Sequence, residues 1–296
     1  IIDKIEIPLR IADDWEEKNI IIPDLKKLMG EKSIDNVKKH FLNLSAGWDS
    51  LDIDENLEIN PKFIGAWEKH RHVFGYTLRS ELVYQLMKSL KYIRDFKLDP
   101  KIRFLIVDEY QDLNKCDLSI IKSLEERGVE LFVAGDDDQS IYGFRKAYPD
   151  GIRNFMAEYK DVSDISLSIC KRCDPKILGL AEFVAKQDVN RVEKNLKSDH
   201  KDPEGNVFLI NYQNQYEEAD GIANICSELI AHEKINPDDI LILSRSDRNK
   251  IFSKVLEDAF QKEGVPFSSS ISDDSPLISN GGLQIISILR LIRNYK

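Results

Sequence analysis

The chain has 296 residues, of which 42% are hydrophobic and 32% are charged, and its formal net charge is −10. This length predicts two domains or one large domain. The acidic balance argues against a passive nucleic-acid coat, which is usually basic, although it leaves room for a protein that holds nucleic acid in one local groove. No run approaches about 18 apolar residues and no signal peptide is visible, so no membrane partner is expected.

Residues 1–98 are predicted to be mostly helical, because apolar residues recur there at helical spacing, as in Phe63 and Trp67. Pro23 marks the start of one of these helices. The acidic, irregular stretch 44–61 is expected to be a loop. The first residue is Ile1 and not Met, which favours a natural start upstream.

The pattern changes after Pro100. Residues 104–107 form a short apolar run, residues 113–128 have helical periodicity, and residues 129–134 form a second apolar run. Strand, helix and strand in such a short stretch predict a βαβ unit and an α/β fold. A parallel sheet of this kind is expected to be buried on both faces.

A second strand–helix–strand unit is predicted further along the chain. The elements expected after the first unit are a polar break at 161–166, helix 174–187, strand 206–211, helix 217–233, strand 239–244, helix 249–263, a short strand at 265–267, a loop at 268–282 and helix 283–293.

Acidic residues follow both strands of the first unit. Asp108 and Glu109 close the first strand, and residues 136–138 with Gln139 close the second. Ligands of open α/β sheets bind at the carboxyl ends of the strands. One carboxylate there can hold hydrated Mg²⁺, and a neighbouring one can polarise an attacking water. Helix capping and loop solvation are the alternative explanation.

Two exact strings carry a resemblance to a known family. Residues 107–112 (VDEYQD) and residues 135–147 (GDDDQSIYGFRKA) resemble motifs II and III of the UvrD/Rep family of superfamily 1 DNA helicases, with agreement at about a dozen positions. The resemblance implies a fold of two partial RecA-like P-loop NTPase domains with parallel sheets, together with a helical accessory domain. It also implies ATP and Mg²⁺ as cofactors.

The same resemblance implies roles at the nucleotide. Asp108 would ligate Mg²⁺, Glu109 would activate the water, and Gln139 would sense the γ-phosphate and couple it to DNA. Residues 167–172 (LSICKR) are similar to motif IV, so Arg172 would reach the γ-phosphate from the second motor domain. The family usually has Asn and Tyr at the two positions before this arginine, where the present chain has Cys and Lys.

The implied DNA-contacting residues lie in the second string. Tyr142 and Phe144 would present aromatic faces to single-stranded bases, and Arg145 would contact the DNA backbone. The family usually has Trp at the position of Phe144 and Gly at that of Lys146, and Phe offers a smaller stacking face.

Four cysteines do not make a disulfide framework in a chain of this length, so reduced thiols in a cytoplasmic protein are expected. Cys170 and Cys173 form a single CxxC pair. Ordinary reduced thiols are the favoured interpretation of this pair, and zinc binding and a redox role are the weaker alternatives. One CxxC pair supplies only two of the four ligands that a zinc site needs.

The sequence contains no phosphate loop of the form GxxxxGK[ST], and the family's late motifs are absent as well. By resemblance, residues 1–97 would be the accessory domain, 98–160 the second half of the first motor domain, and 161–296 the first half of the second. The isolated chain is therefore not expected to hydrolyse ATP at a useful rate.

The favoured function is an ATP-dependent translocase that moves on single-stranded DNA, in the 3′ to 5′ direction usual for the family, and unwinds duplex. Its expected partners are single-stranded DNA, duplex junctions, DNA-repair or replication proteins, and the remaining motor segments of the full-length chain. The alternative is a remnant that binds DNA or protein without hydrolysis.

Overall fold

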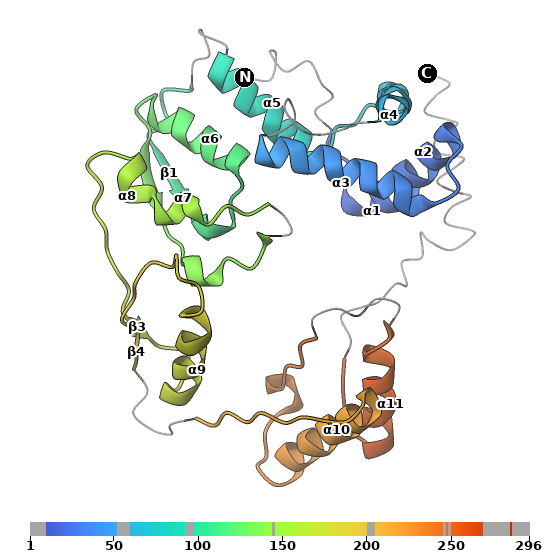
Figure 1. The fold of residues 1–296 in the computed structure, drawn as a ribbon, viewed down its shortest axis with the longest axis vertical. Coiled ribbons are helices and arrows are strands. Elements are labelled where there is room, and N and C mark those ends of the chain that lie inside the picture. Colours follow the sequence, from blue (N-terminus) through green and yellow to red (C-terminus); the bar gives the residue numbers. More distant parts are fainter. Residues whose placement is uncertain are drawn as a thin grey trace. The chain divides into compact units, whose positions relative to one another are not determined.

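The computed structural model describes residues 10–51, 60–92, 98–143, 146–199, 205–244, 247, 250–268 and 285. The chain divides into two compact units, Ile1–Gly205 and Asn206–Lys296 (Figure 1). The three domains expected from the sequence stay a prediction. Among the described helices, none has both the length and the apolar character needed to cross a bilayer.

The first unit begins with helices, as predicted. They are α1 (Asp14–Glu16), the π-helical turn η2 (Glu17–Ile21), α2 (Ile22–Met29), α3 (Ile34–Ser50), α4 (Pro61–Phe74) and α5 (Arg79–Tyr92). The Ser33 and Asn60 side chains accept backbone N–H bonds at the starts of α3 and α4. Gly30 and Gly75 end α2 and α4 with positive φ angles, which glycine adopts without strain.

The predicted loop at 44–61 is wrong in its first part. Helix α3 continues to Ser50 because Leu44 and Trp48 are buried on the side that faces α4 and α5. The Trp48 ring lies 5.8 Å from the ring of Trp67, measured between centroids, and Phe41 packs edge-on against Phe63. Burial of large apolar side chains thus outweighs the acidic local composition. Residues 52–59 lie outside the described part of the chain.

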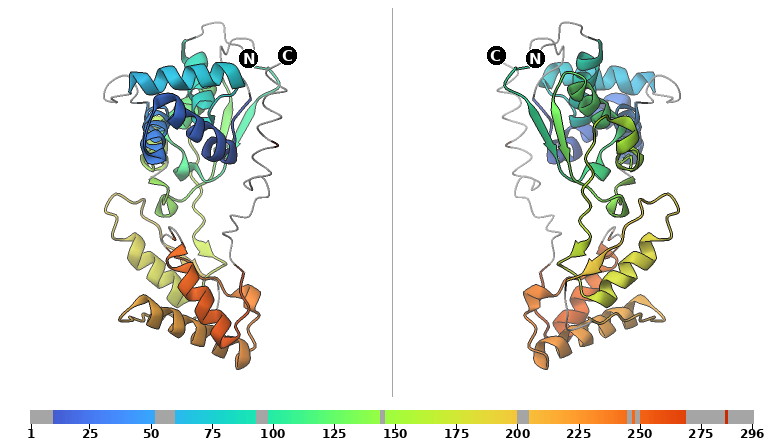
Figure 2. Two further views of the ribbon diagram at one scale, coloured as in Figure 1. Left: turned by 90° about the vertical axis from the view of Figure 1, so that its right-hand side faces the viewer. Right: turned by 90° about the vertical axis from the view of Figure 1, so that its left-hand side faces the viewer.

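The predicted βαβ unit is confirmed. Strand β1 (Phe104–Val107) runs parallel to β2 (Glu130–Val133), with Phe104 opposite Glu130 and Val107 opposite Val133. The 3-10 helix η3 (Tyr110–Asp112) and helix α6 (Lys115–Glu125) connect them. Both views of Figure 2 show the two strands side by side. Asn114 and Asp117 form a reciprocal capping box that fixes the start of α6.

The expected burial of this sheet on both faces is wrong for the described residues. Phe104, Ile106 and Phe132 are exposed, and Ile106 retains 74% of its accessible surface. Successive residues of a strand point to opposite faces, so Phe104 and Ile106 share one face, and Phe132, which lies opposite Ile106, shares it as well. A single crossover helix can cover only the other face.

The first unit continues with short elements. These are the 3-10 helix η4 (Asp137–Gln139), α7 (Asp150–Arg153), α8 (Phe155–Glu158), β3 (Ile169–Cys170), α9 (Pro175–Ala185) and β4 (Lys197–Ser198). The helix expected at 174–187 is confirmed by α9. Strands β3 and β4 pair in parallel, with Ile169 opposite Lys197.

The second unit contains α10 (Gln215–Ala231), the 3-10 helix η6 (Pro237–Asp239) and α11 (Ser253–Glu263), which confirms its two predicted helices. Ala223, Cys226 and Phe260 belong to the core between α10 and α11.

The strands predicted at 206–211, 239–244 and 265–267 are not formed in the described residues. A strand requires a hydrogen-bonded neighbour, and these segments have none there. Leu209 is consequently fully exposed. The helix predicted at 283–293 lies outside the described residues except for Ile285.

Candidate functional site

The site lies where β1 and β2 end. Because the strands are parallel, their carboxyl ends meet at one edge of the sheet. The Ala134 N–H donates to the Val107 carbonyl at 2.8 Å, and the Tyr110 N–H donates to the Ala134 carbonyl at 3.0 Å. These bonds continue the ladder past the strands and hold the two acidic loops beside each other.

Gln111 joins the two loops through its side chain. Its Nε2 donates to Glu109 Oε2 at 2.8 Å, and its Oε1 accepts the Asp136 N–H at 3.0 Å. The Ser140 hydroxyl donates to the Gln111 carbonyl at 3.2 Å. Only 1% of Gln111 is exposed, and both its amide nitrogen and its amide oxygen are hydrogen-bonded, so Gln111 is a buried connector between the two loops. Gln111 was not among the predicted site residues. The sequence feature that could have indicated it is a neutral amide within the acidic segment that follows β1.

The backbone at this edge is tightly constrained. Glu109 has a φ of 53°, a left-handed conformation that is unusual for a residue with a side chain. Such strain costs on the order of 1 kcal/mol and is concentrated at functional sites. A Cβ at Gly135 would lie 2.6 Å from Gln111 Oε1, 2.7 Å from Ile152 Cδ1 and 3.1 Å from the Tyr110 backbone nitrogen, so a side chain there would force these neighbours to shift.

Three predicted residues are accessible at this edge. Asp108 and Glu109 are exposed, and Asp108 Oδ1 accepts the Glu109 N–H at 2.9 Å. Gln139 is also exposed, and its Nε2 donates to Asp136 Oδ2 at 2.9 Å. The Asp136 side chain is therefore bound by Gln139 of its own loop, while its backbone N–H is bound by Gln111 of the loop that follows β1. The structure thus brings Glu109 and Gln139 into one hydrogen-bonded network.

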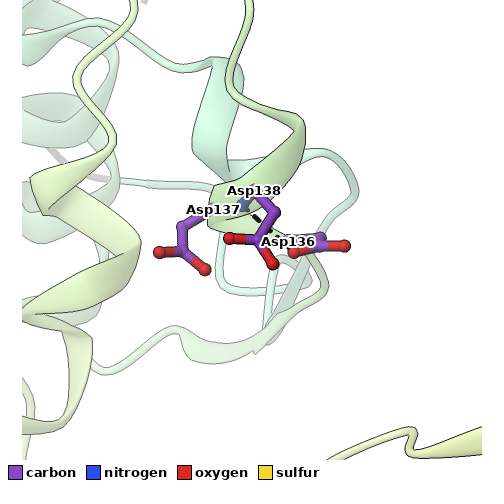
Figure 3. A group of neighbouring side chains, drawn as sticks. All are labelled: Asp136, Asp137 and Asp138. Atoms are coloured by element: carbon purple, nitrogen blue, oxygen red, sulfur yellow. Dashed lines mark hydrogen bonds between the residues drawn. The ribbon is translucent and has the colours of Figure 1, made fainter. Parts of the chain in front are cut away.

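The carboxylates of Asp136, Asp137 and Asp138 cluster at the start of η4 (Figure 3). Their spacing alone would suit a metal ion, but cations of the same unit already bind them. Arg191 donates to both oxygens of Asp138, at 2.9 and 2.6 Å. The Lys194 ammonium forms ion pairs with all three acids.

Asp137 is the buried member of the cluster, with 1% of its side chain exposed. Its Oδ2 accepts from Arg153 Nε at 3.1 Å and from the Val192 N–H at 2.8 Å. Lys194 Nζ lies 2.5 Å from Asp137 Oδ1 and forms an ion pair with it. The geometry of this contact is not that of a hydrogen bond.

The charges of the cluster are mutually stabilised. Burial alone would raise the pKa of Asp137, but Lys194, the Val192 N–H and Arg153 outweigh it and hold that pKa below its ordinary value. The pKa of Asp138 is lowered chiefly by its hydrogen bonds from Arg191. The cluster is therefore an internal ion network. Arg153, Arg191 and Lys194 were not predicted, because they are distant in sequence.

The remaining predicted residues are Arg172, Tyr142, Phe144 and Arg145. Arg172 is exposed in the turn between β3 and α9, and no hydrogen bond within the described part of the chain joins it to Asp108, Glu109 or Gln139. Tyr142 is half-buried. Phe144 and Arg145 lie outside the described residues. The roles assigned to all of these residues stay predictions.

Fold and site together define an α/β protein with an acidic site at the carboxyl edge of parallel strands. Residues 16–160 match the UvrD/REP helicase N-terminal domain. The chain belongs to the UvrD/Rep family of superfamily 1 helicases.

Several curated relatives are similar to the chain. ATP-dependent DNA helicase Rep of Buchnera aphidicola is 32% identical over 211 residues, which are 71% of this chain and 32% of that protein. ATP-dependent DNA helicase srs2 of Schizosaccharomyces pombe is 29% identical over 79% of this chain and 27% of its own length. ATP-dependent DNA helicase PcrA of Staphylococcus aureus is 32% identical over 57% of this chain and 22% of its own length. The chain thus spans about a third or less of these relatives.

Proposed function

We propose that this chain is part of an ATP-dependent DNA helicase that couples ATP hydrolysis to movement on single-stranded DNA and to duplex unwinding. The names of its relatives and the acidic edge of the β1–β2 sheet support this function. In this proposal, residues 98–160 and 161–296 are parts of two RecA-like motor domains, and residues 1–97 are a helical accessory domain. The protein is cytoplasmic, in keeping with four free cysteines.

The proposed nucleotide chemistry rests on Asp108 and Glu109. Mg²⁺ prefers oxygen ligands, and it binds through one or two carboxylates together with waters and substrate phosphates. The exposed carboxylate of Asp108 fits that requirement. When bound, ATP would supply the phosphoryl group, and Mg²⁺ would neutralise the charge on its oxygens. Glu109, oriented by Gln111 Nε2, accepts a proton from the attacking water.

The observation that carries the proposal is the Gln111 link between the two strand ends. Glu109 and Asp136 are bound by opposite ends of one buried amide, and Asp136 in turn holds Gln139. A change at Glu109 on hydrolysis can therefore reach Gln139 through two residues, Gln111 and Asp136. Gln139 leads directly into the segment proposed to contact DNA, which includes Tyr142.

Two further groups complete the proposed motor. Arg172 stabilises the negative charge that develops on the transferred phosphoryl group. Tyr142 and Phe144 stack on single-stranded bases, where each stacked base contributes roughly 1–3 kcal/mol, and Arg145 contacts the backbone.

The test uses the full-length protein that contains this chain. Glu109→Gln should lower the rate of DNA-stimulated ATP hydrolysis by about 10²–10⁴-fold, because it removes a general base, while ATP binding persists. Glu130→Gln changes an exposed acid of β2 in the same way and is the matched control, with an unchanged rate. Turnover that persists in Glu109→Gln would refute the assigned role. DNA binding by the wild-type protein without any hydrolysis would favour the non-hydrolysing remnant.

A further inference from the structure

Two cysteines flank the turn that carries Arg172. Cys170 is the last residue of β3, and only the N-cap residue Asp174 separates Cys173 from the start of α9. The Cys173 N–H donates to Cys170 Sγ at 3.4 Å, so the turn folds the second cysteine back onto the first.

Ser198 of β4 and Asp199, which follows the strand, hold the two ends of this turn. The Asp199 N–H donates to the Cys170 carbonyl at 2.9 Å, and the Ser198 hydroxyl donates to the Cys173 carbonyl at 2.7 Å. The two cysteines are therefore kept close by contacts that do not involve their own sulfurs. Disulfide formation requires this kind of proximity, because it tolerates little variation in the separation of the two residues.

The two thiols have opposite character. The N–H groups of Cys173 and then Arg172 point to the Cys170 sulfur and lower the pKa of its thiol. Burial, and then the neighbouring charge of Cys170, raise the pKa of Cys173. Arg172 favours the charged form of both sulfurs, and Asp174 opposes it at Cys173. A more acidic thiol beside a less acidic one is typical of an attacking and a resolving cysteine.

The other two cysteines provide an internal contrast. Cys116 and Cys226 are buried, and burial raises the pKa of Cys116 to about 12. Both are therefore protected from solution oxidants, which attack accessible thiolates.

We propose that Cys170 and Cys173 form a reversible redox site that a hydroperoxide oxidises to a disulfide. The Cys170 thiolate attacks the terminal oxygen of the hydroperoxide and breaks its O–O bond. Cys170 becomes a sulfenic acid, and the departing oxygen takes a proton to give an alcohol or water. The Cys173 sulfur then attacks the Cys170 sulfur, the S–S bond forms, and hydroxide leaves as water with the Cys173 proton. A dithiol then reduces the Cys170–Cys173 disulfide by thiol–disulfide exchange, which restores both thiols and converts the dithiol into its own disulfide.

The disulfide would close a ring around Lys171 and Arg172 and restrict the turn. Under the proposed function, Arg172 reaches the γ-phosphate, so oxidation of the two cysteines would slow ATP hydrolysis. This consequence rests on the proposed function. The site would then couple the motor to oxidising conditions. The thiol chemistry itself does not depend on that function.

The first experiment follows the two sulfurs in the full chain. The reduced protein is treated with hydrogen peroxide, alkylated with iodoacetamide, unfolded and digested with trypsin. Because trypsin cleaves after Lys171 and Arg172, the Cys170 and Cys173 peptides stay together only if a disulfide joins them. We expect the joined peptides, loss of alkylation at both cysteines, and full reversal by dithiothreitol.

Variants separate the two roles. Cys173→Ser should stop at a Cys170 sulfenic acid that dimedone traps, whereas Cys170→Ser should leave Cys173 reduced. Cys226→Ser is the matched control and should still form the disulfide. The proposal is overturned if Cys170 and Cys173 alkylate fully after peroxide treatment. It is also overturned if the pair is protected by zinc that a chelator removes.

The second experiment addresses the consequence in the full-length protein. Peroxide should lower the ATPase rate of the wild-type protein and leave the rate of Cys170→Ser unchanged. A disulfide that forms without any change in the rate of an active ATPase would overturn the link to Arg172. A protein with no ATPase activity that still forms the disulfide would refute the proposed function and leave the redox site standing.

Discussion

The ion network around Asp137 gives the sharpest test of the fold. Asp137→Ala removes a carboxylate with 1% of its side chain exposed. Arg153 loses one partner and keeps Asp188, while Lys194 keeps two acids. The Val192 N–H, bound to Asp137 at 2.8 Å, loses its acceptor. The substitution therefore breaks three contacts and leaves polar groups with fewer partners.

The expected cost follows from these contacts. Removing one partner of a fully buried ion pair costs about 3–5 kcal/mol, and an orphaned buried donor costs about 1–3 kcal/mol. Because both cations retain other partners, we expect about 3 kcal/mol in total. Asp137→Asn should cost about half as much, since its amide oxygen can still accept one bond. For a unit of this size, about 3 kcal/mol lowers Tm by roughly 6–12 °C.

Thermal unfolding followed by tryptophan fluorescence measures this effect. All three tryptophans lie in the first unit, so the signal reports on the unit that contains the network. Asp150→Ala is the matched control. Asp150 pairs with the same arginine at 3.6 Å, but 48% of its side chain is exposed. Its loss should cost about 0.5 kcal/mol or less. Equal shifts for Asp137→Ala and Asp150→Ala would refute the reasoning.

Three other changes have defined outcomes. Gly135→Ala should destabilise the protein by about 1–3 kcal/mol in urea unfolding, because its Cβ would collide with Gln111; an unchanged midpoint would contradict the close approach. Burial raises the pKa of Asp49 from 3.8 to about 6, so stability should fall as pH rises through that range. Asp49→Asn should remove this slope and, after discounting for partial solvent contact, add about 1 kcal/mol at pH 7; a retained slope would assign it to another group. Hydrogen bonds from Arg191 lower the pKa of Asp138, so its contribution is present near neutrality and is lost below about pH 4 as the carboxylate protonates. Asp138→Asn should make unfolding less sensitive to acid, and an identical acid profile would count against the pairing.

The sequence by itself determined the local elements and the composition of the candidate site. Helix periodicity located α6, α9, α10 and α11, since a helix forms its backbone bonds within a single segment. Chain order and a short crossover made β1 and β2 parallel neighbours, and this placed Asp108 near the segment that begins at Asp136. The exact strings around these acids identified the family.

Only the tertiary structure decided which groups neutralise the acids and which strands are formed. Lys194 reaches Asp136 across 58 positions of sequence, and no local pattern encodes such a pairing. Residues 206–211 have the composition of a strand, yet they lack a hydrogen-bonded neighbour among the described residues, because strand formation depends on a second segment. Gln111 likewise became a connector through its burial between two loops. Contacts between distant segments depend on packing, whereas periodicity and spacing report only on near neighbours in the chain.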